Sequence, residues 1–113
     1  MSIELPDCEE TRAWTQSMLD MIEPSNQAVV SISAFRAERD PLRRVLLLEE
    51  AEKNVARVES AVVRIADATD ALIVLFSEEK VVAALRASVG QMKKQAAQMR
   101  SQLVAELPHA GSA

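Results

Sequence analysis

Only a few residues in the chain have side chains suited to chemistry. The sequence has one cysteine, Cys8, one histidine, His109, no Gly-rich phosphate loop and no paired Cys or His at metal-ligand spacing. His109 lies in the C-terminal segment 108–113, which we expect to be flexible, and a catalytic group needs a rigid scaffold. Cys8 is either a reactive or intermolecular thiol or an inert free cysteine, and the surrounding acids Asp7, Glu9 and Glu10 favour the inert alternative.

The carboxylates of the central segment could suggest a metal centre. They are Glu49, Glu50, Glu52, Asp67 and Asp70. A di-metal site in a helical bundle needs inward-facing glutamates together with Glu-x-x-His motifs, and the only histidine here is far from all five. We therefore expect no metal, no cofactor and no enzymatic activity.

Three basic residues, Arg86, Lys93 and Arg100, are spaced by seven and form a basic stripe on one helix face. The stripe could contact phosphate or an acidic partner, or it could pair with Glu52 and Glu59 inside the protein. The chain carries a net charge of -4, and no aromatic residue stands near the stripe to stack on a base. Internal pairing is therefore the favoured interpretation, and a nucleic-acid-associated regulator ranks as a third functional hypothesis.

The composition indicates the fold class that must position these groups. Of 113 residues only two are Gly and four are Pro, apolar residues make up 49% and aromatic residues 3%. This predicts a single all-α domain over 1–113 with flexible termini at 1–6 and 108–113. Prolines at 24 and 41 delimit two short helices, predicted at about 8–22 and 25–39, and Asp40-Pro41 is a favourable helix start.

Two apolar heptad patterns follow, with spacings that alternate between three and four residues. The first runs through Leu48, Ala51, Val55, Val58, Val62, Ile65, Thr69, Leu72 and Phe76, and the second through Val82, Leu85, Val89, Met92, Ala96, Met99 and Leu103. They predict a long antiparallel helical hairpin, about 41–76 and 78–107, packed with the two short helices into a coiled-coil-like bundle of three to four helices.

The turn of this hairpin is predicted at Ser77. On one straight helix the two patterns would face opposite sides of the rod, about 200° apart, and a turn removes that conflict. Folding back at Ser77 would place Glu59 beside Lys93 and Glu52 beside Arg100. The alternative is one long continuous helix in an oligomeric coiled coil.

The closed end of the hairpin, where the chain turns, carries more apolar residues than a two-helix seam needs. The surplus defines a candidate partner interface of Val63, Ile73, Val74, Leu75, Phe76 and Val81. Alternatively the first helix covers this end through Trp14, Met18, Met21 and Ile22. This requires the first two helices to lie end to end along the hairpin, without the first helix folding back on the second. Both alternatives stay open at this level.

These features lead to three functional hypotheses. The first is a non-enzymatic protein-protein interaction module, a small helical subunit, adaptor or chaperone that self-associates or docks a helical partner through apolar helix faces. The second is a small-molecule-binding or regulatory bundle with methionine-lined helices, and the third is the nucleic-acid regulator. The N-terminus shows no basic and apolar export signal, and the longest apolar run, Ala71 to Phe76, is six residues. We therefore expect a cytoplasmic protein without a membrane span, with secretion without a cleaved signal as the alternative.

Overall fold

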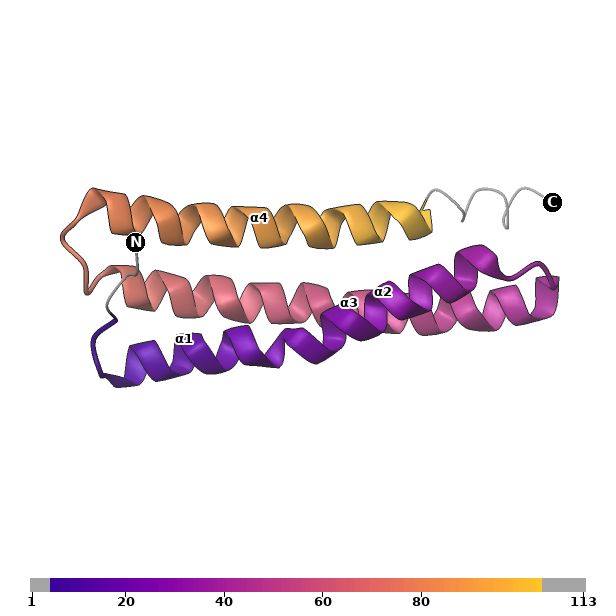
Figure 1. Cartoon of the computed structure of the whole chain (residues 1–113), viewed down its shortest axis with the longest axis horizontal. Helices are drawn as coiled ribbons and strands as arrows, with labels where there is room; N and C mark the ends of the chain where they lie inside the picture. Colours follow the sequence, from indigo (N-terminus) through magenta and orange to yellow (C-terminus); the bar gives the residue numbers. More distant parts are fainter. Residues whose placement is uncertain (1–4, 105–113) are drawn as a thin grey trace.

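The protein is an all-α bundle in which a long central helix is flanked on two sides. A computed structural model describes residues 5–104 and contains α1 (Glu9–Asp20), α2 (Ile22–Ala37), α3 (Pro41–Ile73) and α4 (Glu79–Val104). As Figure 1 shows, α1 and α2 follow one another along one side of α3, and α4 returns along another. The bundle measures 56 × 23 × 20 Å, and the predicted all-α fold is confirmed.

The long hairpin predicted from the two heptad patterns is present. The chain leaves α3 through a turn in which the Leu75 N–H bonds to the Leu72 carbonyl at 3.0 Å, and the next N–H, of Phe76, bonds to the Ile73 carbonyl at 3.1 Å. Residues 74–78 link the two helices, so the continuous-helix alternative is wrong. Helix α3 ends three residues earlier than predicted, and the predicted end of the last helix at 107 lies outside the described residues.

The break between α1 and α2 lies at Met21, whereas the sequence placed it at Pro24. Pro24 is buried in the first turn of α2, and the N–H of the next residue, Ser25, already bonds to the Met21 carbonyl at 3.1 Å. A proline is tolerated there because first-turn N–H groups have no partner within the helix. The prediction that the first two helices are divided at Pro24 is therefore wrong.

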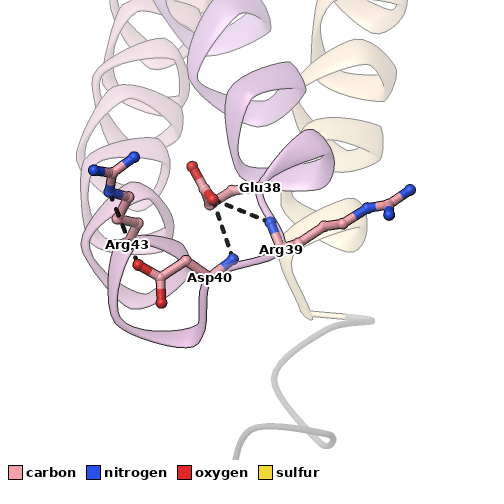
Figure 2. Close-up of polar contacts among 4 residues, drawn as sticks. All are labelled: Glu38, Arg39, Asp40 and Arg43. Carbon is pink, nitrogen blue, oxygen red and sulfur yellow. Dashed lines mark hydrogen bonds and ion pairs between the residues drawn. The ribbon is translucent and has the colours of Figure 1, made fainter.

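The corner between α2 and α3 is built from polar groups (Figure 2). One carboxylate oxygen of Glu38 accepts the backbone N–H groups of Arg39 and Asp40, both at 3.1 Å. Asp40 occupies the N-cap position and Pro41 the first helical position, as predicted. The Asp40 side chain makes no cap hydrogen bond, and its carboxylate lies 3.8 Å from Nε of Arg43 instead.

The core follows the two predicted seams. Its main cluster joins α2, α3 and α4 in the half of the bundle away from the α3–α4 turn, and consists of Ala28, Ile32, Phe35, Ala51, Val55, Val58, Val62, Ala96 and Leu103. Burying a valine or leucine side chain contributes roughly 1.5–3 kcal/mol, so the apolar side chains of this cluster stabilise the packing of the three helices. Nearer the turn, Ile65, Leu72, Leu85 and Val89 continue both seams and are buried.

The structure also decides where the first helix goes. Helices α1 and α2 lie end to end, and α1 packs on the part of α3 that leads to the turn. No Cα atom of α1 comes within 8 Å of one in α4. The first helix therefore covers one side of the closed end, and within residues 5–104 no further helix fills the side between α1 and α4.

Candidate functional site

Five of the six predicted interface residues meet at the closed end. Val74 and Leu75 lie in the turn with 78% and 46% of their surface exposed, and three neighbours that are half-buried complete the group. We call Ile73, Val74, Leu75, Phe76 and Val81 the closed-end patch. The patch exists because the longest apolar run of the chain, Ala71 to Phe76, extends from the end of α3 into the turn.

The sixth residue, Val63, does not belong to this patch. It lies on α3 ten residues before Ile73, which is about 15 Å along the helix. Asp67 and Asp70 are exposed and occupy the same face between Val63 and Val74. Val63 is exposed as an isolated apolar side chain, and such residues are common on protein surfaces.

Helix α1 is held against α3 by a hydrogen bond that the sequence did not predict. The indole Nε1 of Trp14 donates to the hydroxyl of Thr69 at 3.1 Å. Thr69 is the polar interruption of the first heptad pattern and is 2% exposed. The signal for this bond was present in the sequence, since one buried hydroxyl in an apolar seam needs a partner.

The predicted basic stripe is only partly paired inside the protein. Arg100 forms a two-pronged ion pair with Glu59, with Nη2 to Oε1 at 2.6 Å and Nε to Oε2 at 3.2 Å. Arg86 and Lys93 are exposed, and within residues 5–104 no ion pair joins either one to an acidic side chain. These two residues therefore keep their charges available at the surface of α4.

The predicted pairs Glu59–Lys93 and Glu52–Arg100 are wrong, and the direction of helical side chains explains why. Side chains lean toward the N-terminus of their own helix. In the antiparallel α3–α4 pair this brings Glu59 and Arg100 toward one another and moves Glu52 away from Arg100. Glu52 still contributes a weaker attraction to Arg100.

The ion pair shifts the pKa values of both partners. The hydrogen bond from Arg100 is the largest cause that lowers the pKa of Glu59, and its positive charge acts in the same direction. The hydrogen bond to Glu59 likewise raises the pKa of Arg100. Since the side chains keep 42% and 35% of their surfaces exposed, solvent screens the pair.

A cleft of about 460 Å³ lies between α2 and α4 and reaches Val58 of α3. Its lining combines the apolar Met21, Val29, Ile32, Val58 and Met99 with the polar Ser25, Asn26, Ser33, Arg36, Gln95, Gln98 and Gln102. Methionine-lined helices were expected from the sequence, but the position of this cleft was not. The spacing of Gln95, Gln98 and Gln102 on one uncharged face of α4 was the available signal.

The groups considered for catalysis or metal binding lie apart. Cys8 occupies the N-cap position of α1, half-buried, with Sγ 3.4 Å from Oγ1 of Thr11. Within the described part of the chain no three His, Cys, Asp or Glu side chains gather closely enough to hold a metal ion. His109 and most of the predicted flexible termini lie outside the described residues. No helix from residue 5 to 104 is long and apolar enough to cross a membrane.

Comparison with known proteins identifies no similar protein. No family model, no curated protein and no solved structure matches the chain.

Proposed function

We propose that the protein is a non-enzymatic interaction module, a small helical subunit, adaptor or chaperone that docks an amphipathic helix of a protein partner on its closed-end patch. The observation that carries this proposal is the exposure of Val74 and Leu75 at an end where α1 packs on α3 without reaching α4. An apolar helix end covered on one side only is a suitable platform for a further helix.

The charges around the patch specify the partner helix. Asp70, Glu78 and Glu79 are exposed beside it, against one lysine, Lys80. A helix that lays an apolar stripe on Val74 and Leu75 would gain from basic residues along the edges of that stripe, because complementary charges favour encounter and orientation. The proposed partner segment is therefore an amphipathic helix with basic flanks.

Binding of a labelled amphipathic peptide of leucine and lysine tests this proposal. The wild-type protein should bind the peptide with an affinity that falls as salt is added. Val74→Lys should weaken binding at least about tenfold, because it places a like charge in the contact. Val63→Lys, which adds the same charge at an exposed apolar site outside the patch, should change binding little.

The result contradicts the proposal if the wild-type protein does not bind the peptide, or if both variants lose binding equally. Far-UV circular dichroism checks that both variants stay folded. Because Val74 and Val63 are exposed, both variants should retain wild-type helicity. The further variant Ile73→Lys should weaken binding as well. A loss of helicity in that variant would assign Ile73 to the internal packing instead.

The cleft between α2 and α4 supports a second candidate, a bundle that binds an apolar small molecule. Its volume falls within the range of small-molecule sites, and Met21 and Met99 supply an adaptable apolar lining. Such a ligand should raise the melting temperature without a change in oligomeric mass. The effect should disappear in Gln102→Trp, whose ring would fill the cleft from an exposed position, and a ligand set that gives no thermal shift contradicts this candidate.

A further inference from the structure

The cleft between α2 and α4 carries charge of one sign. Among the described residues Arg36 is the only charged one in its lining, and the other polar lining residues are serines, an asparagine and glutamines. The glutamines belong to α4, which contains no acidic residue from Lys80 to Val104. The cleft therefore offers a ligand one positive charge and neutral hydrogen-bond donors, and its lining holds no carboxylate that would repel an anion.

Arg36 is not used by the fold. Its side chain is exposed, and no hydrogen bond or ion pair joins it to another residue between 5 and 104. Glu38, the acidic residue nearest to it in the sequence, instead accepts the backbone N–H groups of Arg39 and Asp40 (Figure 2). Because helical side chains lean toward the N-terminus of their helix, Arg36 reaches back over the turn of Ile32, which also lines the cleft. The guanidinium is thus available to a ligand.

The positive charge lies at one end of the cleft, and apolar side chains follow along the rest of it. Helices α2 and α4 run in the same direction (Figure 1), and Arg36 and Gln102 are the last lining residues on each, so they mark the same end. From this end Ile32, Val29 and Met21 continue along α2 to the other end, about 22 Å from Arg36. The cleft is therefore amphipathic along its length.

We propose that this cleft binds a monocarboxylate with an unbranched alkyl chain, a fatty acid, with the carboxylate at Arg36 and the chain directed toward Met21. The planar guanidinium fork fits the two oxygens of a carboxylate. One cation also matches a monoanion, whereas a phosphate monoester would bring nearly two negative charges to it. The proposal rests on the second candidate function, an apolar ligand in the same cleft, and specifies its class and orientation.

The apolar lining should make affinity depend on the length of the alkyl chain. Each buried CH₂ group should tighten binding by up to about fourfold, because it leaves water for the side chains of Val29, Met21 and Met99. The gain should stop when the chain reaches the end of the cleft. A series from octanoate to hexadecanoate measures this dependence, and an affinity that is independent of chain length would overturn the proposal.

Titration calorimetry with the full chain tests the role of Arg36. Dodecanoate and the uncharged dodecanol are compared below the concentrations at which they form micelles. The wild-type protein should bind one dodecanoate per chain at least about tenfold more tightly than dodecanol, because only the carboxylate pairs with the guanidinium. Arg36→Gln should remove this preference and leave dodecanol binding unchanged. Arg39→Gln is the matched control, since Arg39 is exposed nearby but does not line the cleft.

A pair of variants on α4 tests the orientation. Gln95 and Gln102 are both exposed and line the cleft, about 10 Å apart along the helix. Gln102→Glu places a negative charge at the carboxylate end and should reduce the preference for dodecanoate over dodecanol at least about tenfold. Gln95→Glu adds the same charge near the end of the alkyl chain, where solvent and salt screen it from the carboxylate, and should reduce the preference far less. Equal reductions would overturn the orientation.

The possible failures are distinguishable. Equal affinities for dodecanoate and dodecanol, or dodecanoate binding that survives Arg36→Gln, would overturn the carboxylate site and leave the apolar-ligand candidate standing. Absence of binding by both compounds would overturn the two together. Dodecanoate binding that is lost in Val74→Lys would place the ligand at the closed-end patch and would also overturn the proposal. The substituted residues are exposed, so far-UV circular dichroism should show wild-type helicity in every variant.

Discussion

Trp14 and Thr69, which are 55 residues apart, are joined by a hydrogen bond of 3.1 Å from the indole N–H to the hydroxyl oxygen. Thr69 is buried among apolar residues of α3, and Trp14 lies half-buried on α1. The bond places the only tryptophan of the sequence over the only polar residue of the first heptad pattern. It thereby holds α1 on the closed-end half of the bundle.

The stability lost with this bond should depend on which partner is changed. Trp14→Phe should lower the free energy of unfolding by about 1–3 kcal/mol, because the buried Thr69 hydroxyl loses its partner. Thr69→Val should cost less, because the replacement has a similar shape and the indole N–H can turn to water. Urea denaturation followed by far-UV circular dichroism measures both effects, and the double variant should be no less stable than Trp14→Phe. Losses that simply add would show that the two side chains do not interact.

The ion pair between Glu59 and Arg100 should make stability depend on pH in the acid range. The pKa of Glu59 is lowered in the folded protein, so its contribution is complete above the unfolded pKa of about 4.5 and is lost as the pH falls through the folded pKa. At neutral pH Glu59→Gln should cost about 0.2–1 kcal/mol, because the pair is screened by solvent. The difference from wild type should shrink toward zero in acid and also in high salt. A difference that is independent of pH would argue against the pair, and Glu52→Gln is the matched control with a smaller expected effect.

Gly90 in α4 should be replaceable with a gain in stability. No atom from outside its own helix lies within 4 Å of a Cβ built at this position, and the backbone has no positive φ that would require glycine. Gly90→Ala should therefore stabilise the protein by about 0.5–1 kcal/mol through helix propensity, read as a higher urea midpoint. A loss of stability would mean that another chain packs closely against this part of α4.

Leu72 and Val74 provide a matched comparison at the closed end. Leu72 is fully buried whereas Val74 is 78% exposed, although they are two residues apart. Leu72→Ala should cost about 2–5 kcal/mol because it leaves a cavity in the seam, and Val74→Ala should change stability by less than about 0.5 kcal/mol. Equal costs in urea denaturation would show that Val74 is buried in solution, by a partner or by a second copy.

The helices themselves could be predicted from the sequence because their signals are local. The spacing from Ala51 to Leu72 and from Leu85 to Leu103 places apolar residues on one face of each helix, and those residues are buried. Asp40-Pro41 likewise begins α3 for reasons that involve only neighbouring residues. Pro24 was misjudged because proline is unfavourable inside a helix but tolerated in its first turn, and the exact start of α2 is not a local property.

The tertiary structure decided which surfaces are covered, because burial depends on groups that are distant in the sequence. The Trp14–Thr69 bond sets α1 on α3, and the lean of helical side chains pairs Arg100 with Glu59 in place of Glu52. Periodicity alone identifies apolar faces without showing what covers them. The closed-end residues were therefore predicted, whereas the separation of Val63 from them emerged only once the helices were packed.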